Sequence, residues 1–116
     1  MFRFSLTFGA KVACLAFALS APVAEAQMAP HVQRGFNFAK ANCAVCHSID
    51  RTTLSPLKLA PPFRILHERY DVETLAESLS EGIVTGHQNM PEFRLDADQI
   101  ADFISYLKWL EHRSAK

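Results

Sequence analysis

Apolar residues recur at the three- and four-residue spacing of a helix face in three stretches, residues 30–41, 72–81 and 96–110. The recurring positions are Val32, Phe36 and Ala39, then Val72, Leu75 and Leu79, then Ile100, Phe103, Ile104, Leu107 and Leu110. No stretch alternates apolar and polar residues in the way that a half-buried strand does. The pattern therefore predicts an all-α protein.

Residues that typically begin or end helices stand at the borders of these stretches. Pro30 suits a first helical position, and Asp71 suits the position before a helix, where a carboxylate accepts from free backbone N–H groups. Gly82 is typical of the residue that follows a helix. Asp96 and Gln99 form a pair like a capping box. We therefore expect each stretch to fold as a separate helix.

Two aperiodic segments, residues 48–61 and 83–95, lie between the predicted helices. Prolines, among them Pro61 and Pro62, prevent regular structure in the first segment. A short helix over residues 62–69 follows it. The expected architecture is three to four helices joined by two long loops.

The first 26 residues have a different character. Arg3 and Lys11 give a basic start, residues 12–19 are a short apolar run, and Ala24 and Ala26 are small residues at the positions that a signal peptidase reads. The run is shorter than the roughly 20 residues of a stable membrane span. This order predicts a secretory signal peptide, with an uncleaved N-terminal anchor as the alternative.

Cleavage after Ala26 would separate a signal peptide, residues 1–26, from one exported domain, residues 27–116, in the periplasm. The whole chain has 12 basic residues (Lys and Arg) and 12 acidic residues (Asp and Glu). The expected domain has ten basic and eleven acidic residues. Its formal charge of −1 gives no indication of a nucleic-acid partner. No membrane span is expected after cleavage.

The expected domain contains two cysteines, Cys43 and Cys46, and His47 follows directly. Residues three apart on a helical turn project to the same side, so both sulfurs can meet the vinyl groups of one haem while the imidazole reaches the iron. We therefore predict one haem c, bound through Cys43 and Cys46, with His47 as an iron ligand. A redox dithiol or half of a zinc site is the alternative, but the sequence offers neither a βαβ setting nor a second ligand pair.

Met90 is the expected second iron ligand. It lies in the aperiodic segment before the last helix, and Pro91 stiffens the chain behind it. A thioether favours ferrous iron and so raises the reduction potential. His87 is the rival ligand, and Met90 could instead be an ordinary core residue.

The order of these motifs resembles the class I cytochrome c family over about residues 33–110. The segments that carry the resemblance are Arg34-Gly35, Cys43-Ala44-Val45-Cys46-His47, Ala60-Pro61-Pro62-Phe63, Met90-Pro91-Glu92-Phe93 and Ile104-Ser105-Tyr106-Leu107. The resemblance implies the cytochrome c fold, with three to four helices around one covalently bound haem.

The resemblance also implies roles for single residues. Gly35 should let the first helix cross the last one closely, with Tyr106 resting against it. The carbonyl of Pro61 should accept the Nδ1–H of His47, although a shift of one residue to Pro62 stays open. The family usually has an aromatic residue where this chain has Ala39. The resemblance does not assign partners to the haem propionates: Arg51, Arg64, His67 and Tyr70 are candidates, with a solvated side chain as the alternative for each.

An iron with two protein ligands has no open site for a substrate, so we expect an electron carrier rather than an enzyme. Its partners would be redox proteins that dock transiently on a small apolar patch, to which Val45, Phe63 and Ile83 could contribute, although each could equally belong to the core. One alternative is the cytochrome subunit of a periplasmic dehydrogenase or oxidase complex. Another is a five-coordinate haem sensor or enzyme.

Overall fold

The computed structural model describes residues 27–82 and 90–114, and these residues are helical with no strand. The helices are α1 (Pro30–Asn42), α2 (Leu75–Glu81) and α3 (Ala97–Ser114), together with the short 3₁₀ helices η1 (Phe63–Glu68) and η2 (Val72–Thr74). The predicted all-α class is confirmed. The proposed signal peptide and His87 lie outside the described residues.

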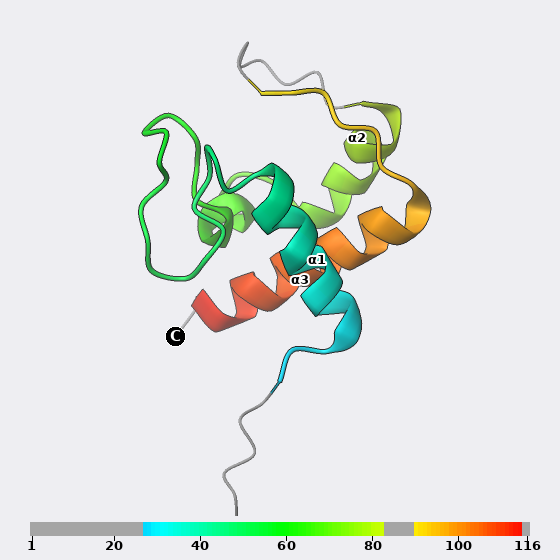
Figure 1. The fold of residues 1–116 in the computed structure, drawn as a ribbon, viewed down its shortest axis with the longest axis horizontal. Helices are drawn as coiled ribbons and strands as arrows, with labels where there is room; N and C mark the ends of the chain where they lie inside the picture. Colours follow the sequence, from blue (N-terminus) through cyan, green and yellow to red (C-terminus); the bar gives the residue numbers. More distant parts are fainter. Residues whose placement is uncertain (1–26, 83–89, 115–116) are drawn as a thin grey trace, which may run out of the picture.

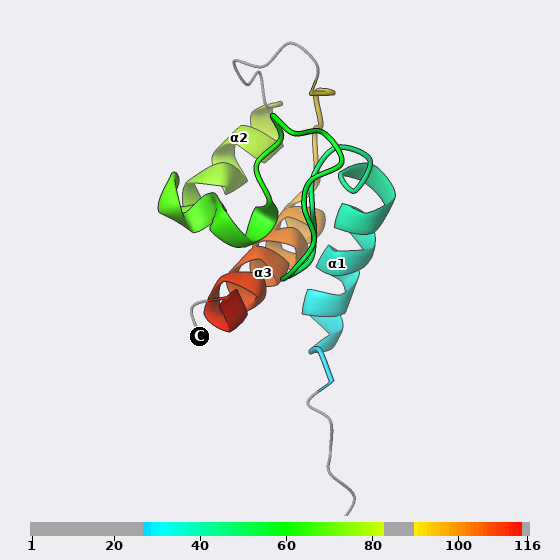
Figure 2. The same ribbon diagram turned by 90° about the vertical axis from the view of Figure 1, so that its left-hand side faces the viewer.

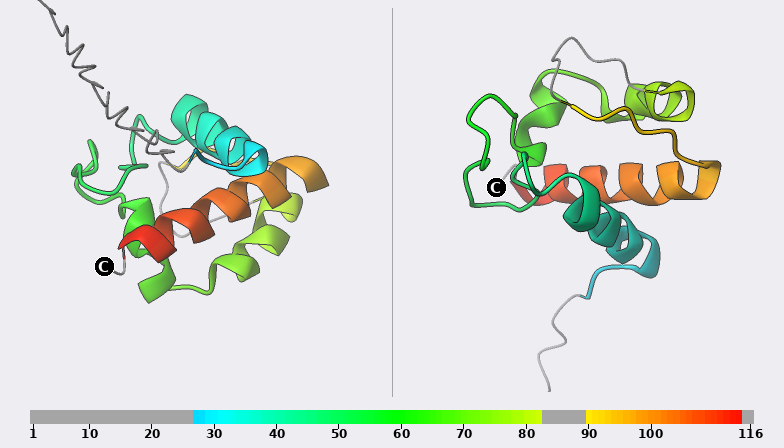
Figure 3. Two further views of the ribbon diagram at one scale, coloured as in Figure 1. Left: turned by 90° about the horizontal axis from the view of Figure 1, so that it is seen from below. Right: turned by 45° about the horizontal axis from the view of Figure 1, so that its top comes forward.

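Helix α3 lies at the centre, between α1 and α2 (Figures 1, 2 and 3). It contacts α1, η1, η2 and α2, so each of the other helices is packed on it. Its apolar positions form the inner core, where Tyr106, Leu107 and Leu110 are almost completely buried. This agrees with the apolar stripe that the sequence shows for the last helix.

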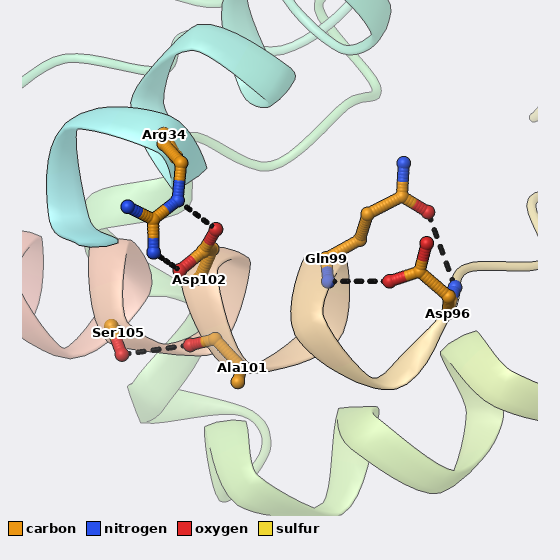
Figure 4. Close-up of polar contacts among 6 residues, drawn as sticks. All are labelled: Arg34, Asp96, Gln99, Ala101, Asp102 and Ser105. Carbon is orange, nitrogen blue, oxygen red and sulfur yellow. Dashed lines mark hydrogen bonds and ion pairs between the residues drawn. The ribbon is translucent and has the colours of Figure 1, made fainter. Parts of the chain in front are cut away.

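The crossing of α1 over α3 depends on Gly35. A Cβ atom there would collide with the backbone carbonyl of Asp102 and would lie 2.8 Å from the Cβ of Tyr106. The close approach predicted for Gly35 and Tyr106 is therefore confirmed. Beside the crossing, the guanidinium of Arg34 donates two hydrogen bonds, of 2.6 and 2.8 Å, to the carboxylate of Asp102 (Figure 4).

The predicted helix borders are largely confirmed. Pro30 is the first residue of α1, and the Asp71 carboxylate accepts the backbone N–H of Glu73 at 3.1 Å. Asp96 and Gln99 form a reciprocal pair ahead of α3, with bonds of 2.8 and 3.1 Å (Figure 4). Gly82 follows α2 with a φ of 102°, a value that favours glycine.

Some helix types and lengths differ from the sequence expectation. The segment after Pro62 and the first turn after Asp71 are 3₁₀ rather than α-helical, and α3 continues to Ser114 rather than ending near Leu110. Short 3₁₀ turns are common where a chain enters a helix or joins two elements. No helix within the described ranges is long and apolar enough to cross a bilayer.

Candidate haem site

One helical turn at the end of α1 carries both cysteines and the histidine. The N–H groups of Cys46 and His47 donate to the carbonyl of Cys43 at 3.1 and 2.9 Å. The N–H of Cys43 donates to the carbonyl of Ala39 at 2.8 Å, so the turn follows directly on the last turn of α1. Both cysteines are half-buried and are not joined in a disulfide. The structure therefore brings together the three residues of the sequence motif.

The imidazole of His47 is oriented by Pro61. Its Nδ1 lies 2.8 Å from the carbonyl oxygen of Pro61, so Nδ1 carries the proton and donates it. The chain at Pro61 is fixed because the N–H of Phe63 donates to the carbonyl of Ser48 at 2.9 Å. The predicted contact is confirmed with Pro61 rather than Pro62. It leaves the lone pair of Nε2 available to a metal.

Phe63 packs beside the imidazole and is buried. Its ring centroid lies 5.1 Å from that of His47 and 5.8 Å from that of Phe103 in α3. Of the two alternatives for Phe63, docking patch or core, the structure shows the core, from which the residue supports the histidine. Val45 is exposed as expected, and Ile83 lies outside the described residues.

Burial raises the pKa of the Cys43 thiol to about 11. The sulfur is therefore a neutral thiol near pH 7. Reactive dithiol centres have the opposite property, since their cysteines show a lowered pKa. Within residues 27–82 and 90–114, no three His, Cys, Asp or Glu side chains gather in a way that could hold a metal ion.

Met90 is half-buried and packs against the apolar core. Cys43 and Phe93 are also partly buried and pack against the same core. The segment that carries it is attached at two points. The ring of Phe93 meets that of Phe38 in α1 at 6.3 Å, and the N–H of Leu95 donates to the carbonyl of Leu79 in α2 at 2.9 Å. These contacts bring a thioether to the core that the cysteine turn also borders.

The loop from Ser48 to Pro61 is held by polar contacts that the sequence analysis missed. Asp50 accepts the N–H and the hydroxyl of Thr53 at 2.7 and 2.6 Å, and Ser55 Oγ accepts the N–H of Ser48 at 3.0 Å. The hydrogen bonds from Thr53 lower the pKa of Asp50. The spacing Asp50-x-x-Thr53 was a local signal for this turn.

Tyr106 ties α3 to the chain that follows His47. Its buried hydroxyl donates to the carbonyl of Ile49, and burial raises its pKa to about 12. Its ring meets Phe36 edge-on at 5.5 Å. Tyr106 of the last helix thus contacts both the middle of α1 and the segment that follows His47.

Three of the candidate propionate partners lie around one depression of about 390 Å³, namely Arg51, Arg64 and His67. Arg64 is already engaged, since its Nη1 donates to the carbonyl of Thr53 at 2.7 Å. The buried Nδ1 of His67 has no hydrogen-bond partner in the described part of the chain. Tyr70 does not line this depression and is half exposed.

An all-helical domain whose first helix runs into a Cys-x-x-Cys-His turn, with the histidine held by a proline carbonyl, defines a protein of the c-type cytochrome class. Residues 32–111 match the sequence model of the family described as "Cytochrome c". The chain therefore belongs to the cytochrome c family, whose members carry covalently bound haem and transfer electrons.

One curated relative is the "Cytochrome bc1 complex cytochrome c subunit" of Corynebacterium diphtheriae. It is 34% identical over 82 residues, which cover 66% of this chain and 26% of the relative. The chain thus spans about a quarter of the length of that relative. No solved structure matches the chain.

Proposed function

We propose that the chain is an exported carrier of single electrons that holds one haem c through thioethers to Cys43 and Cys46, with His47 and Met90 as axial ligands. The observation that carries the proposal is the 2.8 Å contact between His47 Nδ1 and the Pro61 carbonyl. This bond assigns the proton to Nδ1, directs Nε2 away from the carbonyl and makes the imidazole a better donor.

The cysteine turn fits a covalent attachment. Both sulfurs lie on the same turn as His47, and burial keeps the Cys43 sulfur as a neutral thiol. A thiol that adds across a vinyl group places its sulfur on one carbon and its hydrogen on the other, so the product is an uncharged thioether. A half-buried apolar position is favourable for such a product.

Met90 fits the second ligand position because its segment is anchored to both α1 and α2 while the residue itself borders the core. A bound haem supplies an iron that changes oxidation state by one electron. A thioether ligand raises the potential of that change relative to a second imidazole. Two protein ligands in both oxidation states leave no position for a substrate, which supports a carrier rather than an enzyme.

Export is proposed from residues 1–26, whose basic start, apolar run and Ala24-Glu25-Ala26 follow the order of a signal peptide. The periplasm is the compartment that this implies. Residues 27–116 would then be the working domain, with transient redox proteins as partners and no nucleic acid.

A second candidate function is a subunit of a larger electron-transfer complex. The relative in Corynebacterium diphtheriae is described as the cytochrome c subunit of a cytochrome bc1 complex. This chain corresponds to 26% of that protein, so the assembly of the relative is a proposal for this one. A permanent partner would copurify in a fixed ratio, whereas a free carrier would purify alone.

The deciding experiment is an absorption spectrum of the protein made in a host competent for cytochrome maturation. Purified protein should be red after acid-acetone extraction, and its ferric form should show the weak far-red band of a methionine-ligated haem. The ferrous form should bind carbon monoxide poorly at neutral pH. Rapid carbon monoxide binding would favour the five-coordinate sensor or enzyme, and a colourless protein would refute haem binding altogether.

A further inference from the structure

Four large apolar side chains are exposed on the loop after His47 and on the cysteine turn itself. Leu54 and Leu59 are 84% and 90% exposed, Val45 is 79% exposed, and Leu57 is 40% exposed. We call these four residues the leucine face. Exposed apolar side chains that gather on one segment are typical of a surface that another molecule covers.

The loop that carries the leucine face is held in a defined conformation. Asp50 fixes its first turn through Thr53, and Arg64 Nη1 donates to the Thr53 carbonyl at 2.7 Å. Ser55 Oγ accepts the N–H of Ser48 at 3.0 Å. The loop stands at one edge of the molecule, away from α2 (Figures 1 and 3). A surface that is ordered before binding loses little conformational entropy when a partner docks.

The leucine face is continuous with the candidate haem site. The N–H of Leu57 donates to the carbonyl of Cys46 at 3.1 Å, and Val45 lies between the two cysteines in the chain. A partner that covers this face therefore also covers the turn to which haem attachment is proposed. Electron exchange requires such closeness, whereas a lipid surface on the same face would accept no electron.

The charged residues within segment 51–67, which carries three of the four residues of the leucine face, are basic, and the acidic residues Asp50 and Glu68 flank this segment. Between Arg51 and His67 the sequence contains Arg51, Lys58 and Arg64 but no aspartate or glutamate. Lys58 is exposed between two of the leucines, Leu57 and Leu59. A basic rim attracts an acidic one, which speeds the encounter and fixes its orientation.

We propose that the leucine face docks a redox protein whose own docking surface is apolar with an acidic rim. The proposal rests on the proposed function, because it assigns the surface through which the carrier exchanges its electron. The contact combines apolar burial from the leucines with attraction from Lys58.

The test compares haem-loaded full-length protein with the double variant Leu54→Ser/Leu59→Ser. The rate of oxidation of the reduced protein is measured with washed respiratory membranes of the organism that produces it, and separately with ferricyanide, which needs no docking face. Tyr70→Ser is the matched control, since Tyr70 is 54% exposed but lies outside the loop. Lys58→Glu tests the charge, and sedimentation with protein-free vesicles of phosphatidylglycerol and phosphatidylcholine tests a lipid surface.

We expect membranes to oxidise the double variant at least about tenfold more slowly, because the two leucines that the partner would cover are lost. Its ferricyanide rate and reduction potential should be unchanged, and Tyr70→Ser should behave like the wild type. Lys58→Glu should slow the membrane reaction most at low salt. Equal membrane rates for the wild type and the double variant would overturn the proposal.

Two further outcomes would also overturn it. If the wild type binds vesicles and the leucine substitutions abolish this binding, the face binds lipid. If ferricyanide oxidises the wild type but the membranes do not, the membranes contain no redox partner for this face. Failure of the proposed function looks different, because the wild type would then contain no haem and would react with neither oxidant.

Discussion

At the scale of single residues, the histidine and its proline partner explain why the motif turn is followed by a long loop. The loop must return the carbonyl of Pro61 to within 2.8 Å of the Nδ1 of His47. A backbone hydrogen bond holds the end of the loop in this position, because the carbonyl of Ser48 accepts the N–H of Phe63 at 2.9 Å. In the proposed haem site the fixed imidazole of His47 is one iron ligand, so substitutions of the candidates for the other position should reveal the second ligand.

Replacement of Met90 by Ala should lower the reduction potential by about a hundred millivolts or more, within the roughly 0.8 V range that axial ligands control. Loss of the thioether removes the ligand that favours ferrous iron. A redox titration and the loss of the far-red band check this result. His87→Ala is the control and should leave both unchanged; the reverse pattern would assign the ligand to His87.

Tyr106→Phe should destabilise the fold by about 1–3 kcal/mol at neutral pH, because the buried carbonyl of Ile49 loses its donor. The free energy of unfolding, from urea titration of haem-loaded protein, measures this effect. Ser105→Ala, on the neighbouring half-buried position of α3, is the control and should change little, since Ser105 only donates to the carbonyl of Ala101 in its own helix (Figure 4).

The same tyrosine predicts a dependence on alkaline pH. Its pKa is raised from 10.0 to about 12 in the folded protein, so the unfolded chain releases this proton first. Its contribution to stability is therefore complete below pH 10 and decreases as the pH rises toward about 12. Wild-type protein should lose more stability than Tyr106→Phe over this range in parallel urea titrations. Parallel pH curves would contradict the assignment.

At the scale of helices, the crossing of α1 over α3 sets the position of the cysteine turn. Gly35→Ala should destabilise the protein by about 1–3 kcal/mol, because a methyl group would press on the Asp102 carbonyl and on Tyr106. This outweighs the gain of about 1 kcal/mol in helix propensity. Thermal unfolding measures it, and Asn37→Ala, at an exposed position of α1, should stay within about 0.5 kcal/mol of the wild type.

The sequence predicted the helix borders because local chemistry determines them, whereas the glycine crossing was implied by the resemblance to the family. A carboxylate at Asp96 or Asp71 meets N–H groups two or three residues away, so spacing alone reveals the bond. The contact of Arg64 with Thr53 joins two segments whose approach depends on the whole fold, and no local pattern encodes it. The sequence left Phe63 open between surface and core for the same reason, since its burial depends on the contact with Phe103 of α3.

The aromatic departure from the family has a structural explanation at the same scale. Ala39 is fully buried, and two larger residues, Phe36 and Phe38, precede it in α1. Phe36 meets Tyr106 at 5.5 Å, and Phe38 meets Phe103 at 5.5 Å and Phe93 at 6.3 Å. Phe36 thus packs between α1 and α3, and Phe38 packs between α1, α3 and the Met90 segment. The periodicity of the sequence predicted the helix but not these partners.

At the scale of the whole molecule, a domain of this size has a small core, and small domains often need a covalent or metal staple. Met90, Phe93, Cys43 and Ala44 are only partly buried around the core of this protein. A haem held by the cysteine turn would contribute apolar contact at this border. Attachment and stability should therefore be lost together.

The double variant Cys43→Ala/Cys46→Ala tests this dependence. Expressed in a host competent for cytochrome maturation, it should lose its colour in acid-acetone, whereas the wild type keeps it. Its thermal midpoint should also fall. In a domain of this size, each 1 kcal/mol of lost stability lowers the midpoint by about 4–8 °C, and we expect a loss of at least that size. Thr52→Ala, on an exposed loop position, is the expression control. Wild-type protein that also loses its haem to acid-acetone would show that the thioethers are absent, and the two cysteines would then need another role.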